Sequence, residues 1–232
     1  MITVRPSAER GHNQYGWLDT RYTFSFNTYH DPAHMGFRSL RVINDDYIAP
    51  ASGFPTHPHR DMEILTWVLE GKLGHKDSMG HGATLGPGQL QYMSAGTGIH
   101  HSEENPSKDE TLRLIQIWLL PEKKGVKPNY GQKDFSAYLE PGKLVQVASG
   151  SPSGEAVKIH QDASVYAGRF DAGQTAVHDL GPGRHGWLQM AKGEITLNGV
   201  PLKEGDGAAI SGKSKLEISA SNIAEVLLFD LA

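Results

Sequence analysis

The sequence predicts an all-β protein, and three observations point to this class. Short segments rich in Val, Ile, Leu, Trp and Phe recur between Gly, Pro, Asn or Asp residues, which is the pattern of strands joined by turns. The 27 glycines and 13 prolines are too many for a helical bundle. No apolar stripe with a period of 3.6 residues extends over the length of a helix.

The expected strands follow one another along the whole chain. They are Tyr22–Phe26, Leu40–Ile43, Glu63–Leu69, Leu112–Leu120, Val157–Ile159, Trp187–Met190, Glu194–Leu197, Lys215–Ile218 and Val226–Phe229. Between two of these apolar segments, Asn198–Gly199 predicts a two-residue hairpin turn.

An internal repeat predicts two similar β-domains. Two segments, beginning at residues 67 and 187, each contain an apolar strand that ends in a glycine, Gly71 or Gly193. Each continues through a second strand to a turn glycine, Gly88 or Gly205, and a serine follows six residues later. A longer hairpin in the first copy accounts for the different offsets at the two glycines. We expect the domains to be 1–130 and 131–232.

Composition limits the chemistry that is available. The formal charge of −4 argues against binding nucleic acid through a basic surface. With twelve histidines and no cysteine, the chain must hold any metal through His, Asp and Glu, which suits a transition metal with open coordination positions.

The chain ends and the apolar runs predict a cytoplasmic protein. The first residues contain no basic segment followed by an apolar stretch, so no secretory signal is expected. Apolar runs such as Ile64–Leu69 are far shorter than the ~20 residues that span a membrane.

Two closely spaced pairs of side chains predict a metal site. They are His57–Pro58–His59 and His101–Ser102–Glu103. In a strand, residues i and i+2 point to the same side, so two neighbouring strands can direct three imidazoles and a carboxylate at one ion. Glu63, four residues after His59, competes with Glu103 for the fourth position.

The other histidines have weaker claims to a site. His100 is expected to be exposed or to lie behind the ligands, because it points away from His101. His75 and His81 are expected to be solvated in a hairpin. An alignment at the two repeat offsets places none of the four candidate ligands in the second copy, so the fold itself does not require them.

The residues around both pairs resemble motifs of a known family. The stretch Gly53–Glu63 resembles the first cupin motif, and Gly96–Asn105 resembles a modified second motif. The sequence departs from the cupin pattern at Gly96, where Pro is usual, and at Leu90, where Gly is usual. A glutamate two residues after the last histidine, as in His101-Ser-Glu103, is similar to the pirin family in particular. Several further stretches also look like bacterial pirins: Thr23–Phe26, Tyr29–Phe37, Leu40–Asp46, Gln116–Leu119 and Pro128–Tyr130.

The resemblance implies a bicupin fold, with two antiparallel β-barrel (jelly-roll) domains that face each other. It implies one metal, usually iron, in domain 1–130, held by His57, His59, His101 and Glu103. Domain 131–232 would be a degenerate cupin without a metal. Fe(II) is therefore the expected ion, although nitrogen and oxygen ligands also admit Ni, Cu, Mn and Zn.

The resemblance further implies a quercetinase, which opens the central ring of flavonols such as quercetin with O2 and releases CO. Glu103 would then be both a ligand and the catalytic base. The physiological substrate could be another phenolic or enolizable compound. We expect a monomer with no membrane or direct nucleic-acid partner.

Other functions are compatible with the same motifs. The main alternative is a metal-dependent, redox-sensing regulatory protein that acts on a protein partner. A zinc-dependent isomerase or hydrolase and a sugar- or acid-binding storage module are further alternatives.

Overall fold

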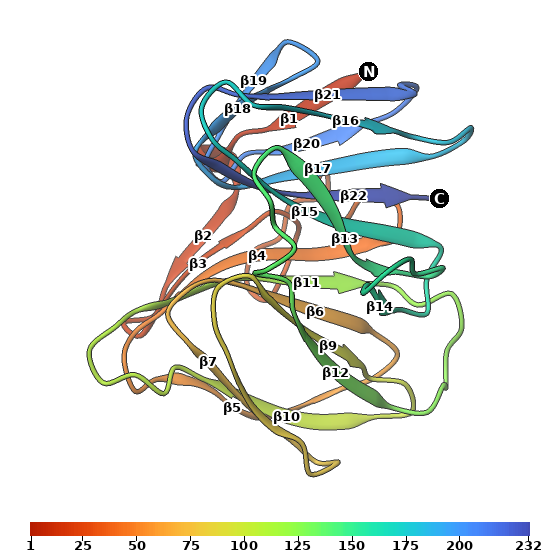
Figure 1. Ribbon diagram of the computed structural model, residues 1–232. Helices are drawn as coiled ribbons and strands as arrows, with labels where there is room; N and C mark the ends of the chain where they lie inside the picture. Colours follow the sequence, from red (N-terminus) through yellow and green to blue (C-terminus); the bar gives the residue numbers. More distant parts are fainter.

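The computed structural model describes all 232 residues and confirms the all-β class. The chain forms β-strands throughout, with one short 3-10 helix, η1 (Ser7–Glu9). No helix is long and apolar enough to cross a membrane. The strands assemble into two seven-stranded and two four-stranded sheets, and one seven-stranded sheet faces one four-stranded sheet in each half of the molecule (Figure 1).

The first barrel is built from one seven-stranded and one four-stranded sheet. The seven-stranded sheet has the order β12-β9-β6-β11-β4-β3-β2, comprising β12 (Asn129–Asp134), β9 (Gln89–Ser94), β6 (Glu63–Glu70), β11 (Leu112–Leu119), β4 (Leu40–Ile48), β3 (Leu18–Tyr22) and β2 (Gly11–Gln14). The four-stranded sheet has the order β5-β10-β7-β8, comprising β5 (Gly53–His59), β10 (Ile99–Glu104), β7 (Leu73–Asp77) and β8 (Gly82–Leu85).

The second barrel has the same construction. Its seven-stranded sheet has the order β1-β20-β17-β22-β15-β13-β14, comprising β1 (Ile2–Arg5), β20 (Gly207–Ile210), β17 (His185–Lys192), β22 (Ala224–Leu231), β15 (Ala163–Phe170), β13 (Lys143–Ser149) and β14 (Val157–Lys158). Its four-stranded sheet has the order β16-β21-β18-β19, comprising β16 (Thr175–Asp179), β21 (Lys215–Ala220), β18 (Glu194–Leu197) and β19 (Val200–Lys203).

The predicted repeat is present in the structure. Strands β6 to β9 and β17 to β20 follow the same path, and the turn glycines of the two copies have matching backbone angles. Gly71 and Gly193 have φ of 72° and 73°, while Gly88 and Gly205 have φ of 79° and 81°. Because L-residues rarely adopt positive φ, these turns favour glycine. The repeat is therefore visible in the sequence as a recurring spacing of glycines.

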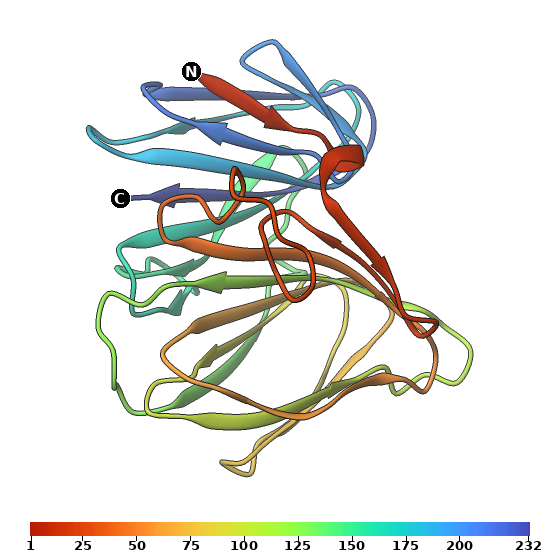
Figure 2. The same cartoon turned by 180° about the vertical axis from the view of Figure 1, so that it is seen from behind.

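The two seven-stranded sheets pack against each other at the centre of the molecule. The largest apolar cluster contains 24 buried residues drawn from both sheets, including Leu65 and Trp67 of β6 with Leu227 and Phe229 of β22. The Trp67 indole also donates a hydrogen bond across this interface to Glu225 Oε1, at 2.8 Å. The four-stranded sheets therefore form the outer layers of the molecule (Figures 1 and 2).

The strand at one edge of each seven-stranded sheet comes from a different part of the chain in the two barrels. Strand β1 pairs with β20 in the second barrel, although it begins the chain (Figure 2). Strand β12 closes the corresponding edge of the first barrel by pairing with β9. The division into domains 1–130 and 131–232 stays a prediction.

One expected strand is displaced in the structure. The strand expected at Tyr22–Phe26 shares only Tyr22 with β3, which runs from Leu18 to Tyr22. The following residues form a tight connection in which Phe26 bridges to Tyr29, and Asn27 has a φ of 51°. Positive φ at Asn27 reverses the chain, which an extended strand cannot do.

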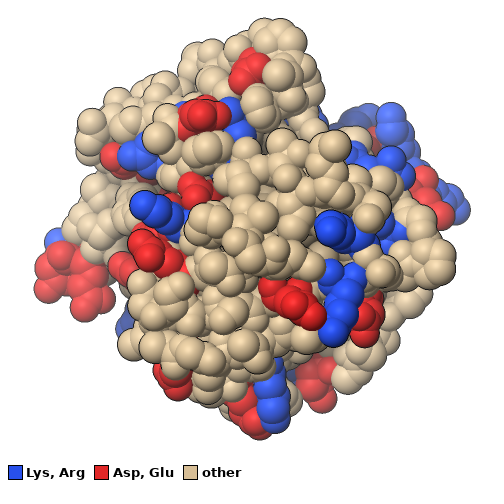
Figure 3. All heavy atoms as spheres, turned by 90° about the horizontal axis from the view of Figure 1, so that it is seen from above, with Lys and Arg blue, Asp and Glu red and all other residues tan.

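The charged side chains are dispersed over the surface. On the face seen from above, Lys and Arg alternate with Asp and Glu between large uncharged areas (Figure 3). This distribution agrees with the small net charge of the sequence.

Candidate metal centre

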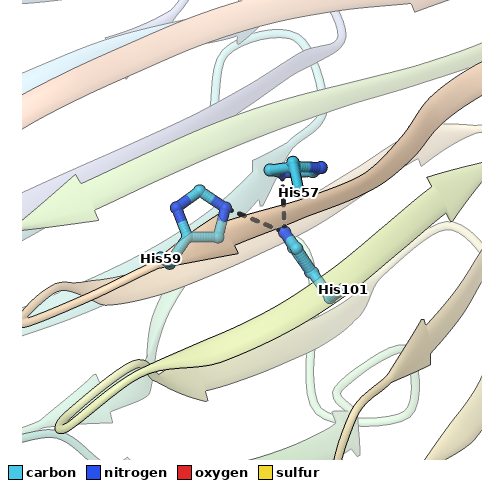
Figure 4. A group of neighbouring side chains, drawn as sticks. All are labelled: His57, His59 and His101. Carbon is cyan, nitrogen blue, oxygen red and sulfur yellow. Dashed lines mark hydrogen bonds between the residues drawn. The ribbon is translucent and has the colours of Figure 1, made fainter.

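Three histidines converge in the first barrel. His57 and His59 lie on β5, and the backbone register pairs His101 of the neighbouring strand β10 with His57. All three rings point toward one another (Figure 4). The Nε2 atom of His101 lies 2.9 Å from Nε2 of His59 and 3.0 Å from Nε2 of His57. The i, i+2 spacing therefore placed these side chains correctly.

The distances fit a shared cation. Two imidazole nitrogens that bind one metal at ~2.1 Å, at right angles to each other, lie about 3.0 Å apart. All three ligand atoms lie within 4.8 Å of one another. The other nitrogen of His57, Nδ1, is 2.8 Å from the Pro55 carbonyl, so a proton there would direct the Nε2 lone pair toward the cluster. These three residues can hold a divalent metal.

The electrostatics keep two of the rings neutral. Burial, followed by the neighbouring imidazoles, lowers the pKa of both His59 and His101 to about 3. Only a neutral imidazole has a free lone pair for a metal. The site is therefore preorganised for metal binding at neutral pH.

Glu103 lies beside the cluster but outside the histidine group. It follows His101 on β10 across a register shift, and it does not belong to the group whose ligand atoms lie within 4.8 Å. Its carboxylate is buried and accepts a hydrogen bond from Gln116 Nε2 at 3.0 Å, while Thr66 Oγ1 lies 3.4 Å from the other carboxylate oxygen. Burial raises the pKa of Glu103. Its role as fourth ligand stays a prediction.

The competing carboxylate, Glu63, has other partners. Tyr92 and Ser94 donate hydrogen bonds to it at 2.8 and 2.6 Å, and so does the backbone N–H of His160. Glu63 therefore links the first barrel to the second half of the chain and takes no part in the histidine group.

The expectation that His75 is solvated was wrong. His75 lies on β7 opposite Glu103, and only 2% of its surface is exposed. Its ring packs against His101 at 5.3 Å between centroids and stacks on Tyr130 at 4.8 Å. Strand alternation from Leu73 would have indicated its inward orientation. His81 and His100 are exposed, as expected.

A cavity of about 470 Å³ opens beside the histidines. This volume is in the range of pockets that hold drug-sized molecules. It is lined by Phe26, Asn27, Asn44, Asp46, Phe54, Pro55, His57, His59, Glu103, Gln116 and Trp118. The Trp118 ring lies edge-on to His59 at 4.9 Å. Aromatic walls of this kind suit a flat ring system.

Asp46 also lines the cavity, although its sequence context does not indicate this. It is buried, and burial, with the nearby charges of Asp45 and Glu103, raises its pKa to about 7, although Arg10 opposes the shift. A run of Asn, Asp and Asp usually marks a turn, so nothing local indicated that β4 carries these side chains through the barrel.

The second barrel retains one histidine at the matching position. Its register pairs His178 with Leu216, as His57 pairs with His101 in the first barrel. The repeat offset points to Asp179, so the sequence placed His178 beside the matching position and not at it. Asp230 Oδ2 lies 3.1 Å from His178 Nε2, and no three-residue ligand group forms in this barrel.

Comparison with known proteins gives a consistent result. A family model described as pirin matches residues 3–119, and one described as quercetinase C-terminal cupin domain matches residues 146–231. The chain is 48% identical to quercetin 2,3-dioxygenase from Escherichia coli (strain K12), covering 100% of this chain and 99% of that protein. It is 42% identical to a pirin-like protein from Caulobacter vibrioides, covering 100% of both.

A solved structure agrees along the whole chain. The crystal structure of the bacterial pirin YhhW from Escherichia coli in complex with nickel(II) matches with a TM-score of 0.94 and 47% identity. The match covers 100% of this chain and 99% of that one.

Loss of the paired histidines is expected to abolish metal binding. Replacing both His57 and His59 with Gln leaves one imidazole at the site, which cannot hold a divalent ion through dialysis. Metal content per chain, measured by mass spectrometry after dialysis, should fall from about one to near zero. The control is His100→Gln, which removes an exposed histidine beside His101. Stoichiometric metal in the double variant would contradict the site.

Asp46→Asn is expected to change how stability depends on pH. A carboxyl whose pKa is raised from 3.8 to about 7 stabilises the folded state most below pH 3.8, and that contribution is lost as the pH rises through 7. The amide does not titrate, so the variant should gain stability relative to the parent between pH 5 and 8. The upper bound of this gain is ~4 kcal/mol.

Urea unfolding of the metal-free proteins at several pH values measures this gain. The Asp171→Asn variant makes the same substitution at an exposed residue and is the control. For Asp46→Asn, a stability difference from the parent that does not change with pH would contradict the raised pKa.

Proposed function

The chain belongs to the pirin family, and we propose that it is a metal-dependent dioxygenase that cleaves the central ring of flavonols such as quercetin with O2 and releases CO. The observation that carries this proposal is the cluster of three converging histidines beside an aromatic-walled cavity. The name of the 48% identical relative supports the same activity.

We propose that the cavity holds one divalent metal through His57, His59, His101 and Glu103. Three neutral imidazoles and one carboxylate would leave a divalent ion with a net charge of +1, which favours an anionic substrate. Fe(II) is the proposed ion, although the donor set also suits Ni, Cu, Mn or Zn. Such an ion would supply Lewis acidity to a flavonol hydroxyl and a place for O2 to react.

Glu103 is the proposed base for the flavonol hydroxyl. Its pKa is raised by burial, which brings a carboxylate closer to the working range of a base near neutral pH. Gln116 donates a hydrogen bond to the carboxylate and fixes its orientation. Glu103 would therefore help to hold the metal and would also accept the proton of the flavonol hydroxyl.

The cavity walls orient the substrate and limit the access of water. Phe54, Phe26 and Trp118 supply flat apolar surfaces around the histidines. Trp118 contacts both His59, at 4.9 Å, and Phe26, at 5.3 Å between ring centroids. A planar flavonol bound between such walls would present its central ring to the metal position.

Several parts of the functional assignment remain predictions. They are the cytoplasmic location, the monomeric state and the alternative of a redox-sensing regulator that acts on a protein partner. Since the chain has no cysteine, a redox-sensing role would depend on the metal.

Turnover of quercetin under air is expected to depend on Glu103. Glu103→Ala should lower kcat/KM by roughly 100-fold or more, because general-base catalysis contributes about that much. The measurement is the loss of flavonol absorbance together with detection of CO by gas chromatography. Glu104→Gln, on the same strand with its side chain 57% exposed, is the matched control and should retain activity. Turnover that is equal in the parent and in Glu103→Ala would contradict the proposal.

A further inference from the structure

A row of polar side chains crosses the inner face of the first barrel. The backbone register places Gln91 of β9, Thr66 of β6, Gln116 of β11 and Asn44 of β4 side by side. All four are buried. Since alternate residues of these strands belong to the apolar interface between the two barrels, this row points the other way, into the barrel.

Both ends of the row have a buried polar atom without a hydrogen-bond partner, Asn44 Oδ1 and Gln91 Nε2, and of these two residues only Asn44 lines the cavity. In the middle of the row, Thr66 Oγ1 donates to Gln116 Oε1 at 3.1 Å, and Gln116 Nε2 donates to Glu103. The amide oxygen of Asn44 is buried and has no hydrogen-bond partner, and only 4% of Asn44 is exposed. A buried polar atom without a partner is costly, so it needs an explanation.

The second barrel shows that the fold does not require this row. The positions that correspond to Gln91, Thr66, Gln116 and Asn44 are, in that order, Ala208, Leu188, Leu228 and Tyr166. These four residues are also in register with one another. They belong to or pack against the apolar cluster that fills the second barrel. The polar side chains of the first barrel therefore serve something other than folding.

Asp46 extends the polar surface toward the cavity. It lies two residues beyond Asn44 on β4, so both side chains face the same way. Both line the cavity of about 470 Å³ that also contains His57 and His59. The position that corresponds to Asp46 in the second barrel is Gly168, which has no side chain.

We propose that Asn44 and Asp46 are specificity-determining residues that accept a hydrogen bond from a second hydroxyl of the substrate. The substrate class is then a flat aromatic molecule with at least two hydroxyl groups, one at the histidine cluster and one at this polar wall. The Asn44 oxygen can only accept, and a carboxyl group accepts in either protonation state. The inference rests on the proposed function, because flavonols are chosen as the test ligands.

The test compares the binding of two flavonols that differ in their hydroxyl groups. Quercetin carries several hydroxyls, whereas 3-hydroxyflavone keeps only the one on the central ring. Dissociation constants are measured for the nickel-loaded protein without O2, so that no turnover occurs. We expect the parent to bind quercetin more tightly, and Asn44→Leu to weaken quercetin binding by about 10- to 100-fold. Binding of 3-hydroxyflavone should change less than about 3-fold, because it makes no contact that the substitution removes.

Three further variants separate recognition from folding. Asp46→Asn keeps an acceptor oxygen and should retain quercetin binding, whereas Asp46→Leu should weaken it. Gln91→Leu makes the same kind of polar-to-apolar change in the same row, at a residue that does not line the cavity. It should leave both dissociation constants unchanged.

The outcomes distinguish this inference from the proposed function. If Asn44→Leu and Asp46→Leu both keep the preference for quercetin, the inference is overturned. The proposed dioxygenase activity is not affected by that result. The parent could bind quercetin selectively, lose this selectivity in both variants, and still not consume quercetin under air. That result would support the inference and overturn the proposed dioxygenase activity. A parent that binds neither flavonol would overturn both.

Discussion

The convergence of three imidazoles is the interaction on which the account of this protein depends. His101 Nε2 lies within 3.0 Å of the other two Nε2 atoms, and burial keeps His59 and His101 unprotonated. Lone pairs held this close need a cation between them or a proton on one partner. Because the fold fixes their strands, the chain presents a binding site for a metal rather than a flexible group of side chains.

The two barrels have the same topology, but the interior of the second is apolar and filled, whereas the interior of the first contains polar groups and a cavity. The second is filled by a cluster of 15 buried apolar residues, while the first holds smaller apolar clusters of 7 and 4 residues beside the histidines and the cavity. A filled barrel packed through a large apolar interface gives the hollow one a rigid support. The first barrel can therefore keep buried polar groups such as Glu103 and Asp46 that would be costly in an unsupported sheet.

The sequence predicted the histidine cluster and the repeat because both follow simple periodicities. Alternation in strands placed His57 and His59 on one face, and glycines at positive φ marked the repeat. Other features depend on pairing between distant strands. Asn44 enters the barrel because β4 lies beside β11. The repeat offset placed the matching position one residue beyond His178, and an error of one residue exchanges the two faces of a strand.

The most direct test of the metal centre is the position of the metal in a crystal of the loaded protein. Anomalous scattering at the metal edge should give one strong peak per chain, within bonding distance of Nε2 of His57, His59 and His101. A peak beside His178 and Asp230 in the second barrel, or the absence of any peak between the three histidines, would contradict the account.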